Sequence, residues 1–240
     1  MNVLNDMPAG KPAANNLSVV STAQSGDPAE RSKAIEHIVT AHWKPLYKYL
    51  RAQYRLSPAE ASAITSNFLR LFDDRSFLAK FDGKKMPLRE FLRQKLDVYV
   101  PTPAARNTSM LPPAFDFPGA EEEFVADQLA PGQSGIEYYN NEWVRTLLTL
   151  AVEGLHNKLA AEGKSQDVAL FMKLDLQDRS GNERVGLETI ANELSMPLDE
   201  AWNSLAKTRQ RFQDILIDLI RSFTSSETEF RREAQAFFRS

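Results

Sequence analysis

An all-α fold is the prediction for this chain of 240 residues, and three observations lead to it. Apolar residues recur at helical spacing along most of the chain, as in the stripe Leu187, Ile190 and Leu194. Proline and serine stand where helices start, as in the Ser-Pro-Ala-Glu run at 57–60, which has the form of a capping box. No segment alternates apolar and polar residues as a β-strand does, and no internal repeat is found.

Composition narrows the class of protein. The chain is 42% hydrophobic and has no cysteine, which indicates a globular protein without disulfides and excludes thiolate and iron–sulfur chemistry. It has no run of about 18 apolar residues, and its start lacks the order of a signal peptide. We therefore expect a cytoplasmic protein with no membrane contact.

The net charge of −3 argues against general coating of nucleic acid, but the charges are unevenly placed. Residues 41–106 carry 13 basic and 6 acidic side chains, a net charge of +7. Residues 107–142 carry 7 acidic side chains and no lysine or arginine. Either these segments meet different partners, which is the interpretation that we favour, or the acidic segment folds over the basic one and neutralises it.

The front of the chain is expected to be a mobile tail, residues 1–24, followed by a helical domain over residues 25–100. Asp27-Pro28 is a start signal for a first helix, and a second is predicted around Trp43 to Leu50. The capping box at 57–60 starts a third. An apolar step at 77–81 and a helix from Pro87 through Leu96 complete the domain.

Residues 101–135 contain six prolines and three glycines with little periodicity, so we predict an acidic, proline-rich linker that is extended where the prolines cluster. A second helical domain is predicted over residues 136–240. It begins with a long helix to about Leu159 and a second helix near Ser165. A polar loop over 178–186, a pair of helices over 187–216 and a last helix through Phe238 follow.

The pair of helices is the most informative segment. Ser195-Met196-Pro197 interrupts the apolar pattern, and proline suits the first position of a new helix. The second helix has an inward stripe that includes Ala201 and Leu205, with cations off it. This is the helix-turn-helix plan for entering the DNA major groove, and equally the pattern of an ordinary αα-hairpin.

The order of these pieces resembles the extracytoplasmic-function sigma factors of bacterial RNA polymerase, in particular a divergent branch with a "YW-x-PLY" opening. That opening stands here as His42-Trp43-Lys44-Pro45-Leu46-Tyr47, followed by Leu56-Ser57-Pro58-Ala59-Glu60-Ala61. Further matches lie at 63–69, 77–92, Glu142-Trp143 and 194–212, so the likeness spans roughly residues 25–240.

The resemblance implies a two-domain initiation factor that takes no cofactor and no small-molecule substrate. Its first domain would dock on core RNA polymerase and open the downstream promoter box. Its second would read the upstream box of promoter DNA, and an inhibitory partner protein is a further expectation. The positions that it implies for polymerase binding are Ala63, Ser66, Asn67 and Arg70.

The chain also departs from the family. Ala63, Ser66 and Asn67 replace Asp, Gln and Glu on the polymerase-binding helix. Glu200, Trp202 and Ser204 replace Thr, Lys and Arg on the recognition helix, and each lost phosphate cation removes one unit of counterion release. A rival hypothesis is therefore an adaptor on a degenerate sigma scaffold, without promoter recognition.

The candidate DNA contacts form three groups, each with a plainer alternative. We expect the basic run of the recognition helix to contact phosphates, unless it is only a solvated face. Base-edge readers should lie earlier on that helix, where the alternatives are a surface amide and an aromatic packed on a neighbour. A third basic group in the first domain would track the melted strand, or be solvated. The three groups are Lys207, Arg209 and Arg211; Trp202, Asn203 and Ser204; and Lys84, Lys85, Arg89 and Arg93.

Enzymatic alternatives find little support. His37 and His42 are five residues apart, which does not place them on one helix face for a metal. The adjacent carboxylates at 121–123 do not converge as an acid/base pair, and no glycine-rich phosphate loop occurs. We expect neither catalysis nor a metal site.

Overall fold

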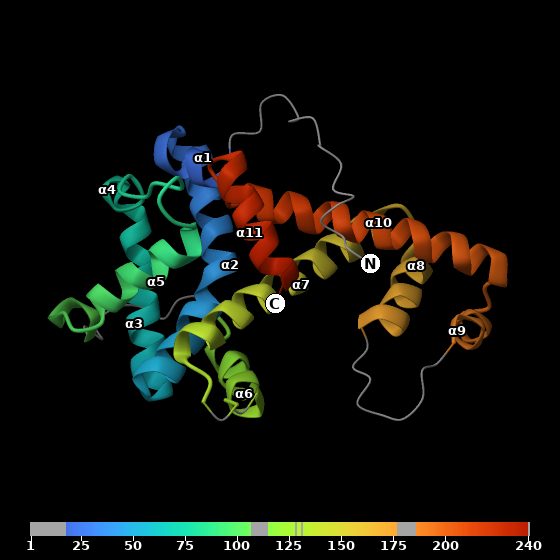
Figure 1. Ribbon diagram of the computed structural model, residues 1–240, viewed down its shortest axis with the longest axis horizontal. Helices are drawn as coiled ribbons and strands as arrows, with labels where there is room; N and C mark the ends of the chain where they lie inside the picture. The colour runs from blue at the N-terminus through green and yellow to red at the C-terminus, as the bar shows by residue number, and fades with distance from the viewer. Residues whose placement is uncertain (1–17, 107–114, 128, 131, 177–185, 240) are drawn as a thin grey trace. The chain divides into compact units, whose positions relative to one another are not determined.

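The computed structural model describes residues 18–106, 115–127, 129–130, 132–176 and 186–239 (Figure 1). Helices account for its regular structure, and these residues contain no β-strand, which confirms the all-α prediction. None of the described helices is long and apolar enough to cross a membrane. Residues 1–17 of the expected tail and most of the loop predicted at 178–186 lie outside the described residues.

The chain divides into two compact units, and the division differs from the predicted domains. One unit comprises Met1–Leu147 with Ile220–Ser240, and the other comprises Leu148–Leu219. Residues 136–147 and 220–240, predicted to lie in the second domain, thus belong to the first unit. The physical reason is aromatic packing: the Trp143 ring lies 6.3 Å from Phe237 and 4.9 Å from the guanidinium of Arg89.

The first unit is built from short and long helices. In chain order they are α1 (Val19–Ser25), α2 (Pro28–Tyr54), α3 (Pro58–Arg70), the 3-10 turn η1 (Leu71–Asp73), α4 (Arg75–Leu78), α5 (Leu88–Tyr99), the 3-10 turn η2 (Pro103–Arg106), α6 (Phe117–Asp127), the start of α7 (Gly135–Ala161), the end of α10 (Leu198–Ser222) and α11 (Glu227–Arg239). The capping box predicted for α3 is present, with Ser57 and Glu60 bonded reciprocally.

Helix α2 corrects the prediction of two separate helices between residues 28 and 50. It is continuous although Pro45 lies inside it, where proline removes one backbone hydrogen bond. Apolar side chains are fully buried on both sides of the proline, Ile38 before it and Leu46 and Leu50 after it. Burial of this continuous apolar face stabilises the helix by more than the loss of one backbone hydrogen bond at Pro45 destabilises it.

Two segments expected to lack structure are helical. Within the predicted tail, α1 starts at a Ser18 cap and buries Val20 and Ala23. Within the predicted linker, η2 and α6 both form. Proline does not prevent α6, because Pro118 lies in its first turn, where the missing N–H has no intrahelical partner in any case.

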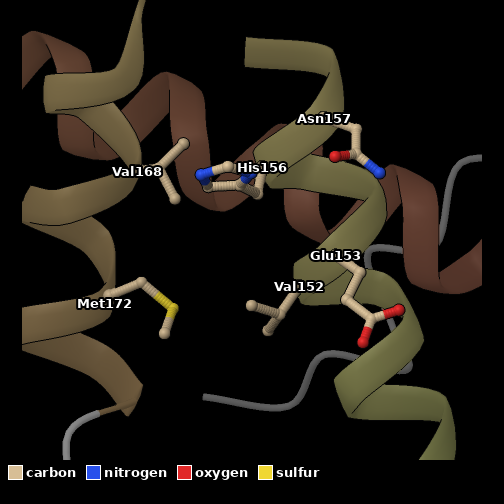
Figure 2. Close-up of a pocket in the computed structure, with 6 residues that line it drawn as sticks. All are labelled: Val152, Glu153, His156, Asn157, Val168 and Met172. Atoms are coloured by element: carbon tan, nitrogen blue, oxygen red, sulfur yellow. The ribbon is translucent and has the colours of Figure 1, made fainter. Parts of the chain in front are cut away.

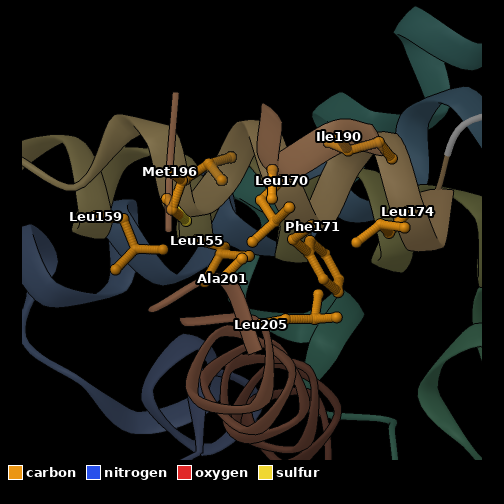
Figure 3. Close-up of a cluster of buried hydrophobic side chains, with 11 residues drawn as sticks. Leu155, Leu159, Leu170, Phe171, Leu174, Ile190, Met196, Ala201 and Leu205 are labelled. Atoms are coloured by element: carbon orange, nitrogen blue, oxygen red, sulfur yellow. The ribbon is translucent and has the colours of Figure 1, made fainter. Parts of the chain in front are cut away.

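The second unit consists of the end of α7, α8 (Ser165–Phe171), the π-helical turn η3 (Met172–Leu176), α9 (Leu187–Glu193) and α10 up to Leu219. Its core is one apolar cluster to which all of these helices contribute (Figure 3). The buried members include Leu155, Leu159, Val168, Leu170, Phe171, Leu174, Ile190, Ala191, Met196, Ala201 and Leu205. This core fixes the angle at which α10 follows α9.

Candidate nucleic-acid interface

The turn between α9 and α10 is a Schellman motif. Ser195 adopts the left-handed conformation, with φ of 53°. Its N–H donates to the Asn192 carbonyl at 3.1 Å, and the Met196 N–H donates to the Ala191 carbonyl at 2.9 Å. Met196 and Ala191 are both buried in the core cluster, which gives the motif its usual apolar contact. The turn is therefore held by backbone bonds and by packing.

The early part of α10 presents two of the three predicted base readers. The Trp202 side chain is exposed, at 59%, and Asn203 is exposed beside it. Ser204 corrects the prediction, because it is buried and its hydroxyl has no partner among the described residues. It lies three residues after Ala201 and one before Leu205, on the inward face, so it cannot reach a base edge. That spacing was visible in the sequence.

The basic run on α10 is accessible, but two of its three cations hold carboxylates. Lys207 is exposed. Arg209 makes a bidentate pair with Asp175 of η3, both N–O distances being 2.7 Å, while its side chain stays 52% exposed. Arg211 donates to Glu162 at 2.8 Å. No pattern in the sequence points to Asp175 or Glu162, which lie 34 and 49 residues from the arginines that they bind.

These ion pairs lie at the surface, where a phosphate can replace the carboxylate as the partner of the arginine. Hydrogen bonds from Lys164 and Arg211 lower the pKa of Glu162 to about 2, so its carboxylate is charged at neutral pH. An exposed pair such as Arg209–Asp175 contributes only about 0–1 kcal/mol. The cationic flank of α10 is thus partly neutralised but not covered by other parts of the second unit.

The four cations predicted to track a melted strand separate into two pairs. Lys84 and Lys85 are exposed, and Lys85 makes a loose pair with Asp82 at 3.8 Å. Arg89 and Arg93 correct the prediction, because their side chains are only 15% and 13% exposed. Arg93 pairs with Asp97 at 2.8 Å, one turn further along α5.

Arg89 is a structural residue of the first unit. Its Nε lies 2.8 Å from a carboxylate oxygen of Glu233 on α11, and it also donates to the Asn140 side chain. Its backbone carbonyl accepts a hydrogen bond from the Tyr139 hydroxyl at 2.9 Å. A cation held from two sides in this way is not available to a nucleic acid.

The predicted polymerase-binding positions on α3 are largely covered. Ser66 and Asn67 are buried, at 8% and 7% exposure, which corrects the expectation that both face a partner. The Asn67 amide donates to the Ala105 carbonyl of η2 at 3.1 Å, and the Ser66 hydroxyl donates to the Ser62 carbonyl at 2.6 Å. Ala63 and Arg70 are half-buried. The turn η2 thus covers Asn67 on the side where a partner would have to contact it.

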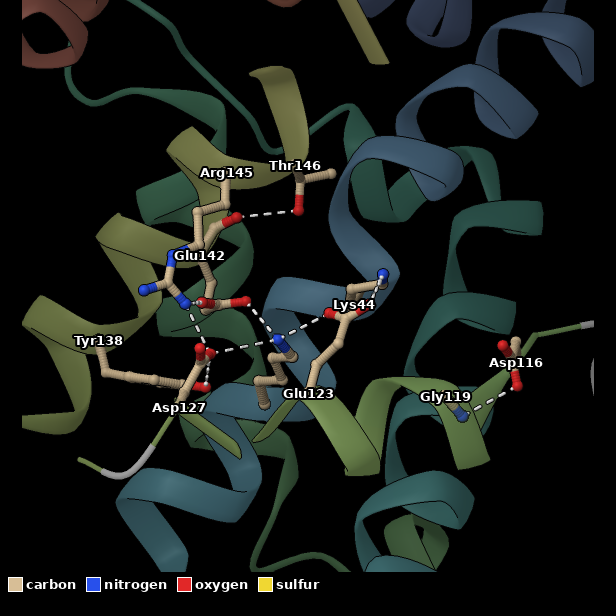
Figure 4. Close-up of polar contacts among 10 residues, drawn as sticks. Lys44, Asp116, Gly119, Glu123, Asp127, Tyr138, Glu142, Arg145 and Thr146 are labelled. Atoms are coloured by element: carbon tan, nitrogen blue, oxygen red, sulfur yellow. Dashed lines mark hydrogen bonds and ion pairs between the residues drawn. The ribbon is translucent and has the colours of Figure 1, made fainter. Parts of the chain in front are cut away.

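The acidic segment, residues 107–142, folds over part of the basic segment, residues 41–106, and neutralises it, which is the less favoured of the two interpretations above (Figure 4). Glu123 of α6 binds Lys44 and Lys48 of α2 at 2.8 and 2.9 Å. Lys48 is almost fully buried and also contacts Glu142 at 2.8 Å and Asp127 at 3.6 Å. Burial disfavours its charged form, but the hydrogen bonds to Glu142 and Glu123 outweigh this effect and raise its pKa.

A pocket of about 420 Å³ lies in the second unit, between α7 and α8 (Figure 2). Its lining mixes aliphatic side chains with Glu153, His156 and Asn157, and these three lie along α7. The described residues contain no group of three or more side chains able to hold a metal ion.

His42 is fully buried, with its Nδ1 2.8 Å from the Ile38 carbonyl and its ring against Phe223. Among the residues that the structure describes, we see no acidic, basic or nucleophilic side chains that converge as a catalytic site would require.

Comparison of the chain with protein-family models, with curated protein sequences and with solved structures finds no match in any of the three.

Proposed function

We propose that the protein is a sigma-factor-like transcription initiation protein, which binds core RNA polymerase in the cytoplasm and directs it to promoter DNA. The observation that carries the proposal is the arrangement of α9, its Schellman turn and α10. It leaves Trp202 and Asn203 exposed early on α10 and the cations exposed later. A helix presented in this order has base readers toward its N-terminus and phosphate contacts beyond them.

DNA binding by this face requires an exchange of partners. Arg209 and Arg211 would leave the carboxylates of Asp175 and Glu162 for phosphate oxygens, while Lys207 binds directly. Asn203 would pair with a base edge, adenine being the base that an amide matches bidentately. Asp199 and Glu200 at the start of α10 repel phosphate and limit the affinity.

A second candidate function is a protein–protein adaptor on the same scaffold. The observation in its favour is the coverage of Asn67 by η2, since a polymerase-docking surface should be open to its partner. The burial of Ser204 points the same way, because it removes one of three base readers.

Affinity purification of the full-length tagged protein from its host distinguishes the two candidates. We expect polymerase subunits to copurify in stoichiometric amount and the eluate to retain promoter fragments. Purification of other proteins without any polymerase subunit would support the adaptor and overturn the proposal. Trp202→Ala with Asn203→Ala is the matched variant: it should keep the polymerase and lose the sequence preference for DNA.

A further inference from the structure

Helix α2 carries an aromatic and basic surface that the proposed function does not use. Trp43, Tyr47 and Arg51 follow one another at intervals of four residues, and Lys44 lies beside Trp43. Residues at this spacing share one helix face, and eight residues extend over about 12 Å. We call these four residues the α2 face. Cations that alternate with aromatic rings are the composition of a surface that binds single-stranded nucleic acid.

The aromatic part of the α2 face is covered by rings from the acidic segment. Phe115 stacks on Trp43 with ring centroids 5.1 Å apart and planes 11° from parallel. Phe117 meets both Trp43, at 5.6 Å, and Tyr47, at 5.1 Å. The flat contact of Phe115 on the indole is the geometry in which a nucleobase stacks on an aromatic side chain.

The cations of the α2 face are covered by carboxylates of the same segment. Arg51 holds Glu121 through two N–O contacts of 2.8 and 2.6 Å, and Tyr47 donates to the same carboxylate at 2.7 Å. Lys44 holds Glu123 at 2.8 Å. A guanidinium grips a phosphate with the same two-pronged geometry. The segment therefore supplies rings to the rings and anions to the cations, as a nucleic acid strand would.

Besides these contacts, the segment Phe115–Asp127 places Phe124 beside Arg51 and Tyr138, and Asp127 on Lys48 and Arg145, so ring contacts and ion pairs hold it to the first unit. Ala120 is the single buried residue among those of α6. An isolated helix of fewer than about 12–15 residues is only marginally stable in water, so α6, with 11, depends on its contacts with the rest of the first unit. Lys48 keeps its 2.8 Å contact with Glu142 of α7 when Glu123 leaves. Removal of α6 thus leaves no buried cation without a counter-charge.

We propose that the α2 face is a binding site for single-stranded nucleic acid and that the segment Phe115–Asp127 occupies it as a built-in mimic. A strand that displaces the segment stacks a base on Trp43 and places phosphates on Lys44 and Arg51. The site lies within the first unit and uses no residue of α9 or α10. The proposed site can therefore be tested separately from promoter recognition by α10.

The test removes the anionic hold of the segment while keeping the chain complete. Glu121→Gln with Glu123→Gln loses the two carboxylates on Arg51 and Lys44, whereas Glu122→Gln with Glu153→Gln makes the same change of net charge at two exposed positions. We expect a fluorescein-labelled oligothymidylate to bind the first variant about tenfold more tightly at low salt than the control or the unaltered protein. Its anisotropy gives the affinity.

Adding Lys44→Ala and Arg51→Ala to the first variant should abolish the gain and lower the salt slope by about 1.4 units, or about 0.7 for each single-strand phosphate contact.

Phe115→Ala with Phe117→Ala releases the segment by removing its ring contacts while the charges stay intact, and it should also raise the affinity for oligothymidylate. A thermal melt by circular dichroism verifies that each variant is folded. Lys207→Ala with Arg211→Ala on α10 should leave oligothymidylate binding unchanged, which separates this site from the promoter interface.

Three results would overturn the proposal. One is equal oligothymidylate affinity in the two charge-matched variants. Another is equal affinity for a duplex, since a paired base cannot stack on Trp43. The last is binding of a peptide with the sequence of residues 115–127 to the opened variant without binding of oligothymidylate, which would make the α2 face a docking site for acidic protein segments.

Discussion

The basic side chains of the first unit and those of α10 differ in what holds them, although the sequence places both in runs that suit a nucleic acid. In the first unit, Arg89 and Lys48 are buried and satisfied by carboxylates from other helices. On α10, Arg209 and Arg211 hold carboxylates at the surface and remain in water. Burial, rather than charge, therefore separates cations that maintain the fold from cations that a ligand can take.

The energies follow from this difference. Removing one member of a buried pair takes an ion partner from a charge that water does not reach, whereas an exposed cation exchanges one anion for another at little cost. Variants that compare the two environments should therefore give unequal effects from the same chemical change.

Lys48→Met should have the largest effect, a loss of about 3–5 kcal/mol in the free energy of unfolding. The change removes the cation that Glu123, Asp127 and Glu142 share, so the buried Glu142 keeps the ion pair with Arg145 and loses the one with Lys48. Urea denaturation followed by circular dichroism measures it. Lys44→Met is the matched control on the same helix and should cost less than about 1 kcal/mol, because Lys44 is partly solvated. Similar losses in both variants would contradict the distinction between the two environments.

The buried His42 should make the first unit sensitive to acid. Burial, with smaller contributions from His37 and Arg89, lowers the pKa of His42 from 6.5 to about 4, although the hydrogen bond to the Ile38 carbonyl acts in the opposite direction. The unfolded chain thus binds a proton that the folded chain refuses. The contribution of His42 to the free energy of unfolding should be fully present above pH 6.5, and about 3 kcal/mol of it should be lost by pH 4.

His42→Gln provides the control for this pH dependence. Glutamine keeps a side-chain N–H that can donate a hydrogen bond but does not titrate. The free energy of unfolding, measured by urea denaturation from pH 7 to pH 4, should decline about 3 kcal/mol less in the variant than in the unaltered protein. Parallel curves for the two proteins would show that His42 is not the group responsible.

The exposed cations of α10 should affect DNA binding rather than stability. Lys207→Ala with Arg211→Ala should flatten the salt slope of duplex binding by about two units, equivalent to about tenfold in affinity between 50 and 200 mM salt. Arg231→Ala with Arg232→Ala changes the net charge equally on the exposed face of α11 and should leave the slope unchanged. If the two double variants behave alike, α10 is not the DNA interface.

The smallest effect concerns the turn that precedes α10. Ser195→Gly should raise the free energy of unfolding by about 0.5–1 kcal/mol, because glycine adopts a positive φ without the cost borne by serine. Gly163→Ser is the opposite change at φ of 73°, where an added Cβ meets no atom within 4 Å, and should lower stability by a similar amount. A melting temperature that moves in the same direction in both variants would contradict this explanation from backbone conformation.

Local patterns in the sequence predicted the helices well and their contacts poorly. The capping box at Ser57 and the helix start at Pro28 depend on neighbouring residues, and both are present. The partner of Arg89 lies 144 residues away in Glu233, and no local pattern points to it. The same holds for Asp175 and Glu162 opposite the arginines of α10, so a basic run in the sequence cannot show which of its members are free.

Two errors have causes that the sequence did contain. Ser204 follows Ala201 by three residues, so helical spacing alone places it on the buried face. Prolines near 118 favoured an extended linker, yet a proline in the first turn of a helix costs nothing, and the glutamates after it are the carboxylates that α2 binds. The coverage of Asn67 by η2 depends on tertiary packing, and no local pattern in the sequence predicts it.

The C-terminal helix has a consequence for any attempt to study the two units apart. Glu229 of α11 fills the space that a Cβ at Gly83 would need, and Glu233 holds Arg89. A fragment that stops before Glu227 would strip the counter-charge from Arg89 and uncover the Trp143 ring, both far upstream. Limited proteolysis that clips this last helix should therefore loosen the amino-terminal half of the molecule, and recombinant dissection has to keep both ends of the polypeptide together.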